Sequence, residues 1–258
     1  MLTVLEVAGP ALVVDAGRPG RMHEGIPPGG PMVPELFAAA NRAAGNAPDA
    51  PAIETFGRIA VALDDRRIEA VARAARVAYL AVPGGLDVPW VLGGRGTLLV
   101  AGLGGHEGRL LRRGDRIPVG AAAGAPEILD VDLAPGAPIR VVPGPDAPAP
   151  LGEHTISPVG DRTGIRLLGA VAAPPAPAGA SAPMTCGAIQ LPPSGEPIVL
   201  GPDCPTTGGY PVIAVVVAAD RGRLFARRAG ERVTFVAVTP PSATPRSARS
   251  RRPPSPPG

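Results

Sequence analysis

A short stretch in the last quarter of the chain brings together side chains that can hold an oxygen atom. The sequence DCPTTGGYP contains the hydroxyl groups of Thr206 and Thr207, followed by Gly208, Gly209 and Tyr210. The two glycines lack Cβ atoms, so a ligand can approach their backbone, and successive N–H groups can converge on one oxygen. The pattern predicts a rim for a small polar ligand. A tight turn whose hydroxyls are satisfied within the protein is the structural alternative.

Three other positions carry groups suited to acid–base or binding chemistry. In GLGGHEGR, His106 is a candidate acid or base and Arg109 a candidate clamp for a carboxylate or phosphate, unless the segment is only a solvated hairpin loop. Gln190 lies in the apolar frame IQLPP, where a buried amide either ties strands together or binds a ligand amide. Cys204 has no neighbouring His or helix start to activate it, so we predict a small buried residue rather than a nucleophile.

The composition excludes several kinds of chemistry. The chain contains no Lys, so its basic residues are all Arg, and neither a side-chain Schiff base nor a Walker A loop can form. Phosphate groups would have to meet Arg, backbone N–H groups or a metal. The two cysteines are too few for a disulfide framework or for a zinc site of their own. No metal-ligand spacing, catalytic-triad signature or dinucleotide fingerprint is present, and we predict no metal site.

The formal net charge of +3 comes from one end of the chain. Residues 240–258 hold four arginines and no acidic residue, which leaves −1 for the rest of the chain. We therefore do not predict a nucleic-acid-binding face. The terminal segment lacks apolar periodicity and is predicted to be disordered. No basic segment precedes the first apolar stretch, and the run 212–219 is too short to cross a bilayer, so we expect a soluble, cytoplasmic protein.

The elements that would position these groups are mostly strands. Glycine (35) and proline (36) are abundant, which disfavours long helices and favours short strands joined by tight turns. One helix is predicted over residues 34–44, with Pro34 in its first turn and Gly45 as its stop. A second helix is predicted by propensity over residues 66–76. Apolar strand segments are IRVV, AYLAV, PIVL, VIAVVV and RVTFVAV.

Four motifs recur in the same order in the two halves of the chain. DAGRPGRM matches GDRTGIRL, GIPPGG matches IQLPPSG, VAYLAVPGG matches VIAVVVAAD, and RLLRRGDRIPV matches RLFARRAGERVTF. The repeat predicts a mainly β protein with few short helices, built from two tandem barrel-like units that close their own sheet edges. We place the units at residues 1–135 and 136–239, followed by the terminal segment.

Several segments resemble one known family. In chain order they are DAGRPG, GIPPGGPM, AANRAAGNAPDAPAIE, YLAVPGGLDVPWVLGGRGT, AGLGGHEGRLLRRGD, RVVPGP, GAIQLPPSGEPIVL and DCPTTGGYPVIAVV. They are similar to the family that contains the C subunit of 5-oxoprolinase, the carboxyltransferase part of urea amidolyase and the sporulation-kinase regulator KipA. The resemblance implies two cyclophilin-like β-barrels, the first of which lacks a piece between Ile53 and Val77.

The resemblance also implies a function. It points to the C subunit of an ATP-dependent 5-oxoprolinase, working with an A subunit together with a KipI-like B subunit, with ATP and Mg²⁺ in the complex and no nucleic acid or membrane as partner. The alternatives are a biotin-dependent carboxyltransferase component acting on urea or a similar amide, and a non-catalytic KipA-like regulator. The site residues that we assign fall into two groups. Catalytic roles go to Thr206, Thr207, Tyr210 and Gln190, and substrate contacts to Gly208, Gly209, Arg95, His106, Arg109 and Asp203.

Overall fold

The computed structural model describes residues 1–122, 124–144, 146, 151–169, 171 and 179–239. The predicted disordered segment 240–258 lies outside these residues. Within them the fold is mainly β, as predicted, with two short α-helices. The helices are α1 (Pro34–Ala43) and α2 (Arg221–Ala226), and the 3₁₀ turns are η1 (Met22–Glu24), η2 (Leu99–Ala101) and η3 (Ala218–Asp220). None of the helices in the described residues has the length and hydrophobicity needed to traverse a lipid bilayer.

The first half of the chain forms two separate sheets. One has four strands in the order β5-β4-β1-β7, and the other has three in the order β2-β3-β6. The strands of the first sheet are β1 (Leu2–Ala8), β4 (Arg58–Leu63), β5 (Arg66–Val71) and β7 (Arg116–Ile117), and those of the second are β2 (Ala11–Val14), β3 (Ala52–Thr55) and β6 (Ala78–Leu80). Apolar side chains of both sheets, including Val4, Val13, Ile53 and Ile59, form one buried cluster.

The second half forms a closed barrel of seven strands. Their order around the barrel is β10-β13-β12-β15-β8-β16-β9, so no strand of the barrel has a free edge. The strands are β8 (Ile139–Pro143), β9 (Glu153–Gly160), β10 (Gly164–Leu168), β12 (Ala188–Gln190), β13 (Ile198–Leu200), β15 (Val212–Val216) and β16 (Arg232–Ala237). The short strands β11 (Ala182–Pro183) and β14 (Thr207–Gly208) pair separately beside it.

Alternation of apolar and polar residues explains which side chains of a barrel strand point into the core. In β10, Ile165 and Leu167 are fully buried while Arg166 and Leu168 are exposed, which is the period-two pattern of a strand with one face in a core. The barrel core also contains Met32 and other buried residues of the first half, so the two halves share an apolar cluster. Burial of this shared surface holds the halves together.

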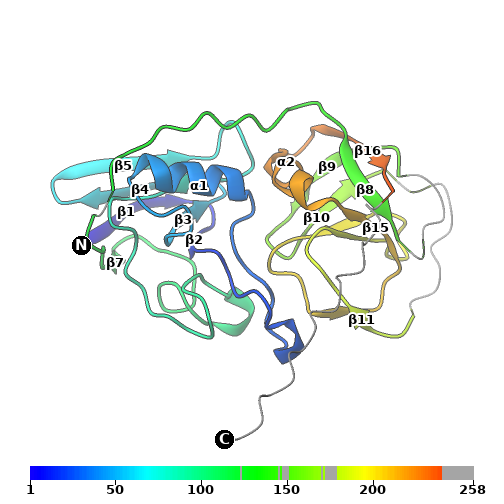
Figure 1. Cartoon of the computed structure of the whole chain (residues 1–258), viewed down its shortest axis with the longest axis horizontal. Helices are drawn as coiled ribbons and strands as arrows, with labels where there is room; N and C mark the ends of the chain where they lie inside the picture. Colours follow the sequence, from blue (N-terminus) through cyan, green and yellow to red (C-terminus); the bar gives the residue numbers. More distant parts are fainter. Residues whose placement is uncertain (123, 145, 147–150, 170, 172–178, 240–258) are drawn as a thin grey trace, which may run out of the picture.

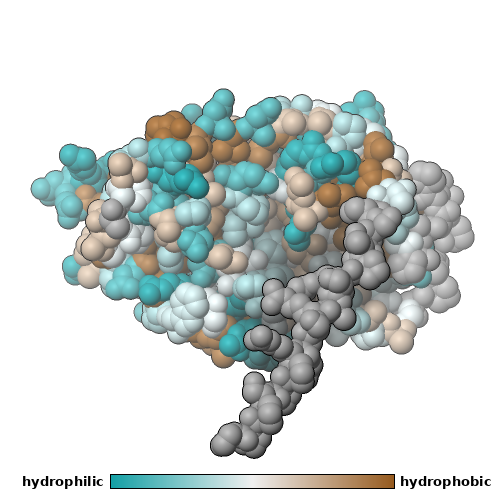
Figure 2. Space-filling view, viewed as in Figure 1, coloured by the Kyte–Doolittle hydropathy of each residue, from teal (hydrophilic) through white to brown (hydrophobic). Residues whose placement is uncertain are grey.

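The two halves lie side by side and are joined by one long connection. Figure 1 shows the segment after β7 crossing from the first lobe to β8 in the barrel, and it passes close to α1 on the way. The contact with α1 is made by an ion pair between Arg42 and Glu127 and by a hydrogen bond between their backbones. Figure 2 shows polar and apolar residues interspersed over this face of the molecule.

Two expectations from the sequence need correction. The first half does not close into a barrel: β7 is two residues long and meets β1 only at Leu2 and Thr3, and no ladder of the described residues joins the four-stranded sheet to the three-stranded one. The predicted helix over residues 66–76 is also wrong, because β5 pairs along its whole length with β4 in a hairpin. The helix at 34–44 is confirmed to within one residue by α1.

Candidate functional site

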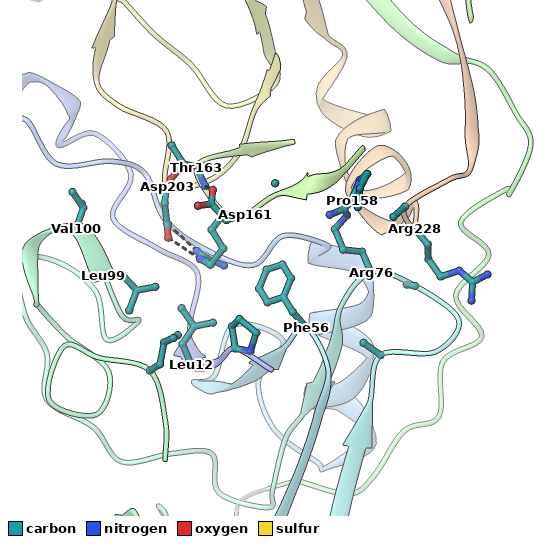
Figure 3. Close-up of a pocket in the computed structure, with 17 residues that line it drawn as sticks. Leu12, Phe56, Arg76, Leu99, Val100, Pro158, Asp161, Thr163, Asp203 and Arg228 are labelled. Carbon is teal, nitrogen blue, oxygen red and sulfur yellow. Dashed lines mark hydrogen bonds and ion pairs between the residues drawn. The ribbon is translucent and has the colours of Figure 1, made fainter. Parts of the chain in front are cut away.

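A cavity of about 800 Å³ lies between the two halves of the molecule. One part of its lining is apolar and includes Leu12, Phe56, Leu99 and Val100 of the first half. The other part carries polar side chains, namely Arg76, Asp161, Arg162, Thr163, Asp203 and Arg228. In Figure 3, Leu99 and Val100 lie at one end of this inter-half cavity and Arg76 and Arg228 at the other, with Asp161 and Thr163 between them.

The turn between β9 and β10 places three polar residues at the cavity. One carboxylate oxygen of Asp161 accepts the backbone N–H of Thr163 at 2.7 Å, which fixes the turn. The Thr163 side chain is exposed, and Arg162 between these residues is buried. The turn therefore presents a carboxylate and a hydroxyl to the cavity while it directs a guanidinium into the protein.

Arg162 links the two halves at the base of the cavity. Its guanidinium contacts Glu54 of β3 at 2.5 Å and the backbone carbonyl of Gly30 at 2.7 Å, and it binds both carboxylate oxygens of Asp203 at 2.7 and 2.8 Å. The two carboxylates raise the pKa of Arg162 and outweigh the opposing effect of its burial. A buried cation with two hydrogen-bonded carboxylates is fully compensated, so Arg162 holds Asp203 in place.

The remaining oxygen of Glu54 is also occupied. It accepts the backbone N–H of Met32 at 2.8 Å and the hydroxyl of Tyr79 at 2.6 Å. Burial and the neighbouring Glu54 carboxylate raise the pKa of Tyr79 well above its usual value, so its hydroxyl stays protonated and donates a hydrogen bond to Glu54. The Val33 backbone N–H donates to the same hydroxyl at 2.9 Å. This closed network makes the base of the cavity rigid.

The opposite end of the cavity is basic. Arg228 extends into solvent, with 57% of its side chain exposed, and pairs with Glu231 at 3.2 Å. Arg76 is partly buried, and its Nε and Nη2 atoms donate to the backbone carbonyls of Arg227 and Ser157 at 3.0 and 3.4 Å. The cavity thus combines carboxylates at its middle with guanidinium groups at one end.

A second cavity, of about 440 Å³, lies against the outside of the barrel near β11 and β14. Gly208, Gly209 and Tyr210 line it together with Met184 and Asp146. A Cβ atom built on Gly208 would lie 2.9 Å from the amide nitrogen of Gln190 and would crowd Met184, so the absence of a side chain permits this packing. The glycine-rich stretch therefore borders a hollow, as the rim interpretation requires.

The other residues predicted around this stretch lie close to the second cavity. Thr207 is exposed and Thr206 partly buried, and neither lines the cavity. The Gln190 side chain is buried and donates to the Tyr210 carbonyl at 3.3 Å, which ties two segments together. Cys204 is fully buried, as predicted, and burial raises its thiol pKa to about 12.

The predicted residues of the first half lie elsewhere. Arg95 binds the carboxylate of Asp87 and the Val88 carbonyl, each at 3.0 Å. Arg109 makes two hydrogen bonds with Asp115, whose pKa it lowers, and His106 lies 3.5 Å from the same carboxylate. None of these three predicted residues lines either cavity. Of the ten, Asp203 alone lines the cavity between the halves, and the roles assigned to all ten stay predictions.

Several residues at the inter-half cavity were not identified from the sequence. Arg162 and Asp161 lie in GDRTGIRL, a stretch used above only as evidence for the repeat. A signal for Glu54 was present, because an acidic residue inside the apolar segment PAIET needs a buried partner. Arg76 carries no sequence signal that separates it from the other arginines.

The fold and the cavity can now be compared with known proteins. The family model described as carboxyltransferase domain, subdomain A and B, matches residues 64–237. The chain belongs to this carboxyltransferase domain family. The match covers the β5 strand, both cavities' polar residues from Arg76 onward, and the whole barrel.

Two curated relatives of this carboxyltransferase-family chain match over nearly its full length. It is 32% identical over 291 residues to the 5-oxoprolinase C subunit of Escherichia coli (strain K12), covering 92% of this chain and 91% of the relative. It is likewise 32% identical over 288 residues to the 5-oxoprolinase C subunit of Haemophilus influenzae, covering 93% and 92%. Urea amidolyase of Lachancea kluyveri is 36% identical, but over only 38% of this chain and 7% of its own length.

Solved structures agree with the fold. The crystal structure of TTHA0988 superposes with a TM-score of 0.79 and 27% identity, covering 91% of this chain. This chain spans only 55% of TTHA0988. The K. lactis urea amidolyase structure superposes with a TM-score of 0.73 at 23% identity, over 92% of this chain and 19% of that one, which supports the shared fold alone.

Proposed function

We propose that this chain is the C subunit of an ATP-dependent 5-oxoprolinase, which opens the 5-oxoproline lactam to L-glutamate. The observation that carries the proposal is the full-length similarity to the C subunits of two 5-oxoprolinases, each match covering more than nine tenths of both chains. The similarity to urea amidolyase covers a much smaller share of this chain. The inter-half cavity supports the proposal because it combines carboxylate, hydroxyl and guanidinium groups.

Lactam opening needs an activated carbonyl and a proton for the departing nitrogen. ATP supplies the activation, because a phosphorylated carbonyl oxygen becomes a leaving group. Water then adds to the carbon, the ring C–N bond breaks as nitrogen takes a proton, and a second water releases phosphate from the acyl group. In this scheme the Thr163 hydroxyl donates to the lactam oxygen, and Asp161 accepts a proton from the attacking water and passes it to the departing nitrogen. Arg162 keeps Asp203 oriented beside them.

The nucleotide and its metal need groups beyond those of this chain. The chain has no Lys, so no Walker A loop is available to the phosphates. Among the described residues, no group of three or more His, Cys, Asp or Glu side chains is arranged to hold a metal ion. We therefore assign the binding of Mg²⁺ to the nucleotide's own phosphates and to the partner proteins of the complex. Those partners are the A subunit of the enzyme together with its KipI-like B subunit.

The second candidate function is transfer of a carboxyl group to urea or a similar amide. The name of the matching family and the partial similarity to urea amidolyase favour it. Because the chain contains no Lys, it cannot carry biotin on a biotinyl-lysine, and a separate chain would have to deliver carboxybiotin. A KipA-like regulatory role would leave the inter-half cavity without a substrate.

The test is reconstitution of the complex with and without this chain. We expect ADP and glutamate to form from 5-oxoproline only when all the subunits are present, and urea with a carboxybiotin donor to give no product. Asp161→Asn keeps an oxygen to accept the Thr163 N–H, so the turn should persist while turnover falls about 100-fold, as for loss of a general base. Asp65→Asn, an exposed change in the β4–β5 turn, is the matched control.

The same assay separates the two cavities. Tyr210→Phe removes a hydroxyl at the second cavity and leaves the inter-half cavity untouched. A fall in turnover with Tyr210→Phe but not with Asp161→Asn would move the proposed site to the second cavity. Undiminished activity in the complex that lacks this chain would show that the chain takes no part in the reaction. Activity with urea instead of 5-oxoproline would favour the second candidate.

A further inference from the structure

Arg76 stands apart from the other arginines of the inter-half cavity because it has no carboxylate partner in the described part of the chain. It lies between the strands β5 and β6 of the first half, in a segment that touches the barrel, and its backbone N–H donates to the Ala226 carbonyl at 2.9 Å. Its side chain reaches the carbonyls of Ser157 in β9 and Arg227 after α2. The barrel thus fixes the position of a side chain that the first half supplies.

The two carbonyl contacts leave much of the guanidinium free. Arginine has five N–H donors, and only Nε and Nη2 of Arg76 donate to other described residues. No carboxylate of the described residues lies within ion-pair distance of this guanidinium. Burial lowers the pKa of Arg76, and the charge of Glu231 partly opposes this effect. A partly buried cation without a bonded anion loses part of its hydration and gains no ion pair in return.

Glu231 acts on Arg76 only from beyond ion-pair distance, because its carboxylate contacts two other arginines instead. It lies 4.0 Å from Arg227 and 3.2 Å from Arg228. The guanidinium groups of Arg76, Arg227 and Arg228 therefore have one carboxylate, Glu231, to balance them beside this end of the cavity, which gives a local excess of two positive charges. The middle of the cavity has the opposite balance, because Asp161 and Asp203 accompany the compensated Arg162. A ligand with an anionic group at one end matches this distribution.

We propose that Arg76 binds the carboxylate of the substrate. The inference rests on the proposed function, since 5-oxoproline carries a carboxylate on the carbon next to its lactam nitrogen. The planar guanidinium matches a carboxylate through two parallel hydrogen bonds. With its carboxylate on Arg76, the lactam points toward the Asp161–Thr163 turn at the middle of the cavity. Urea has no carboxylate, so the same residue makes the site selective for an acidic amide.

The test compares two lactams in the reconstituted complex. 2-Pyrrolidinone has the same ring as 5-oxoproline and lacks the carboxylate. We expect Arg76→Gln to raise the KM for 5-oxoproline about 10- to 100-fold, as for loss of a charge-assisted hydrogen bond, and to leave the KM for ATP unchanged. Turnover of 2-pyrrolidinone should be poor with the unaltered complex and no poorer with the variant. Arg76→Lys should recover part of the affinity, because it keeps the charge and loses the bidentate geometry.

The controls separate this proposal from the proposed function. Arg73→Gln changes an exposed neighbour that does not line the cavity and should leave both KM values unchanged. If the unaltered complex does not turn over 5-oxoproline, the proposed function fails. In that case, calorimetric measurement of the affinity of the full chain for each of the two lactams decides whether Arg76 binds a carboxylate. Equal affinity for both lactams, an unchanged KM for 5-oxoproline in Arg76→Gln, or a rise confined to the KM for ATP would each overturn the role of Arg76.

Discussion

Asp220, at the end of η3, joins two parts of the barrel through one carboxylate. Its oxygens accept the backbone N–H, Nε and Nη2 of Arg140 in β8 at 2.8, 3.0 and 2.8 Å, and Arg223 of α2 contacts it at 2.7 Å. The hydrogen bonds from Arg140 are the main cause that lowers its pKa to about 2. The folded state therefore favours the ionised carboxylate, and its contribution to stability is present at neutral pH.

The sign of the pH dependence follows from that depressed pKa. The pKa of Asp in an unfolded chain is about 3.9. The stabilisation by Asp220 is therefore complete above about pH 5 and is lost as the pH falls toward the folded-state pKa of about 2. Asp220→Asn should lower the free energy of unfolding at pH 7 by about 1–2 kcal/mol. The difference from the unaltered chain should shrink as the pH falls from 5 to about 2, as measured by urea titrations. A difference that is independent of pH would contradict this account, and Asp65→Asn is the control.

Single residues also show what a sequence can and cannot reveal about a site. The stretch from Thr206 to Tyr210 was found because its glycines and hydroxyl groups are adjacent in the chain. It does border a cavity. Arg76, Asp161 and Asp203 are distant in sequence, and only the packing of the two halves brings them to one cavity. No local sequence pattern indicates that these three residues line one cavity, so their proximity could not be predicted from this sequence by itself.

At the scale of elements, the hairpin of β4 and β5 shows how a turn can override propensity. Residues 66–76 favour a helix by propensity because they are rich in Arg and Ala, yet Ile59 pairs with Ala70 and Val61 with Ile68 across the hairpin. The turn contains Asp64 with φ of 51°, in the left-handed region that Asp tolerates better than most residues. The two consecutive aspartates at 64–65 were the available turn signal.

That turn gives a prediction about hairpin stability. Asp64→Val places a β-branched residue at positive φ and should lower the free energy of unfolding by about 1–2 kcal/mol. Asp64→Gly should be neutral or stabilising, because Gly adopts this conformation freely. Urea denaturation of both variants measures the effect, with Asp65→Val, one residue along in the same turn, as the control. Equal losses for the two valine variants would show that backbone conformation at Asp64 is not the cause.

The lengths and pairing of the strands explain why only one of the two expected barrels closes. The motif repeat correctly indicated β-rich halves, and the strand segments IRVV, PIVL and VIAVVV all lie in the barrel as β8, β13 and β15. Closure depends on ladders between strands that are remote in sequence. In the first half the strands β6 and β7 have three and two residues, and the two sheets share a side-chain core without a ladder between them among the described residues. Apolar periodicity predicts strands but not their partners.

At the scale of the whole molecule, Arg162 of the barrel connects the two halves through Glu54 of the first. Both side chains are buried, with 5% and 0% of their surface exposed, and the barrel residue Asp203 completes the network. Such a buried arrangement contributes little when replaced as a unit by apolar groups, but removal of one partner leaves an uncompensated charge. The network should therefore fix the position of the two halves relative to each other, and so the shape of the cavity between them.

A double-mutant cycle tests this connection. Arg162→Met should lower the free energy of unfolding by about 3–5 kcal/mol, because two buried carboxylates lose their partner. Adding Glu54→Gln should recover part of that loss, because one of the stranded charges is removed, and the interaction energy should exceed about 1 kcal/mol. Arg66→Met, at an exposed arginine of β5 without an ion pair among the described residues, is the control for loss of charge. Strict additivity of Arg162→Met and Glu54→Gln would mean that the halves are held by their shared apolar core alone, and the cavity would then keep its shape without the network.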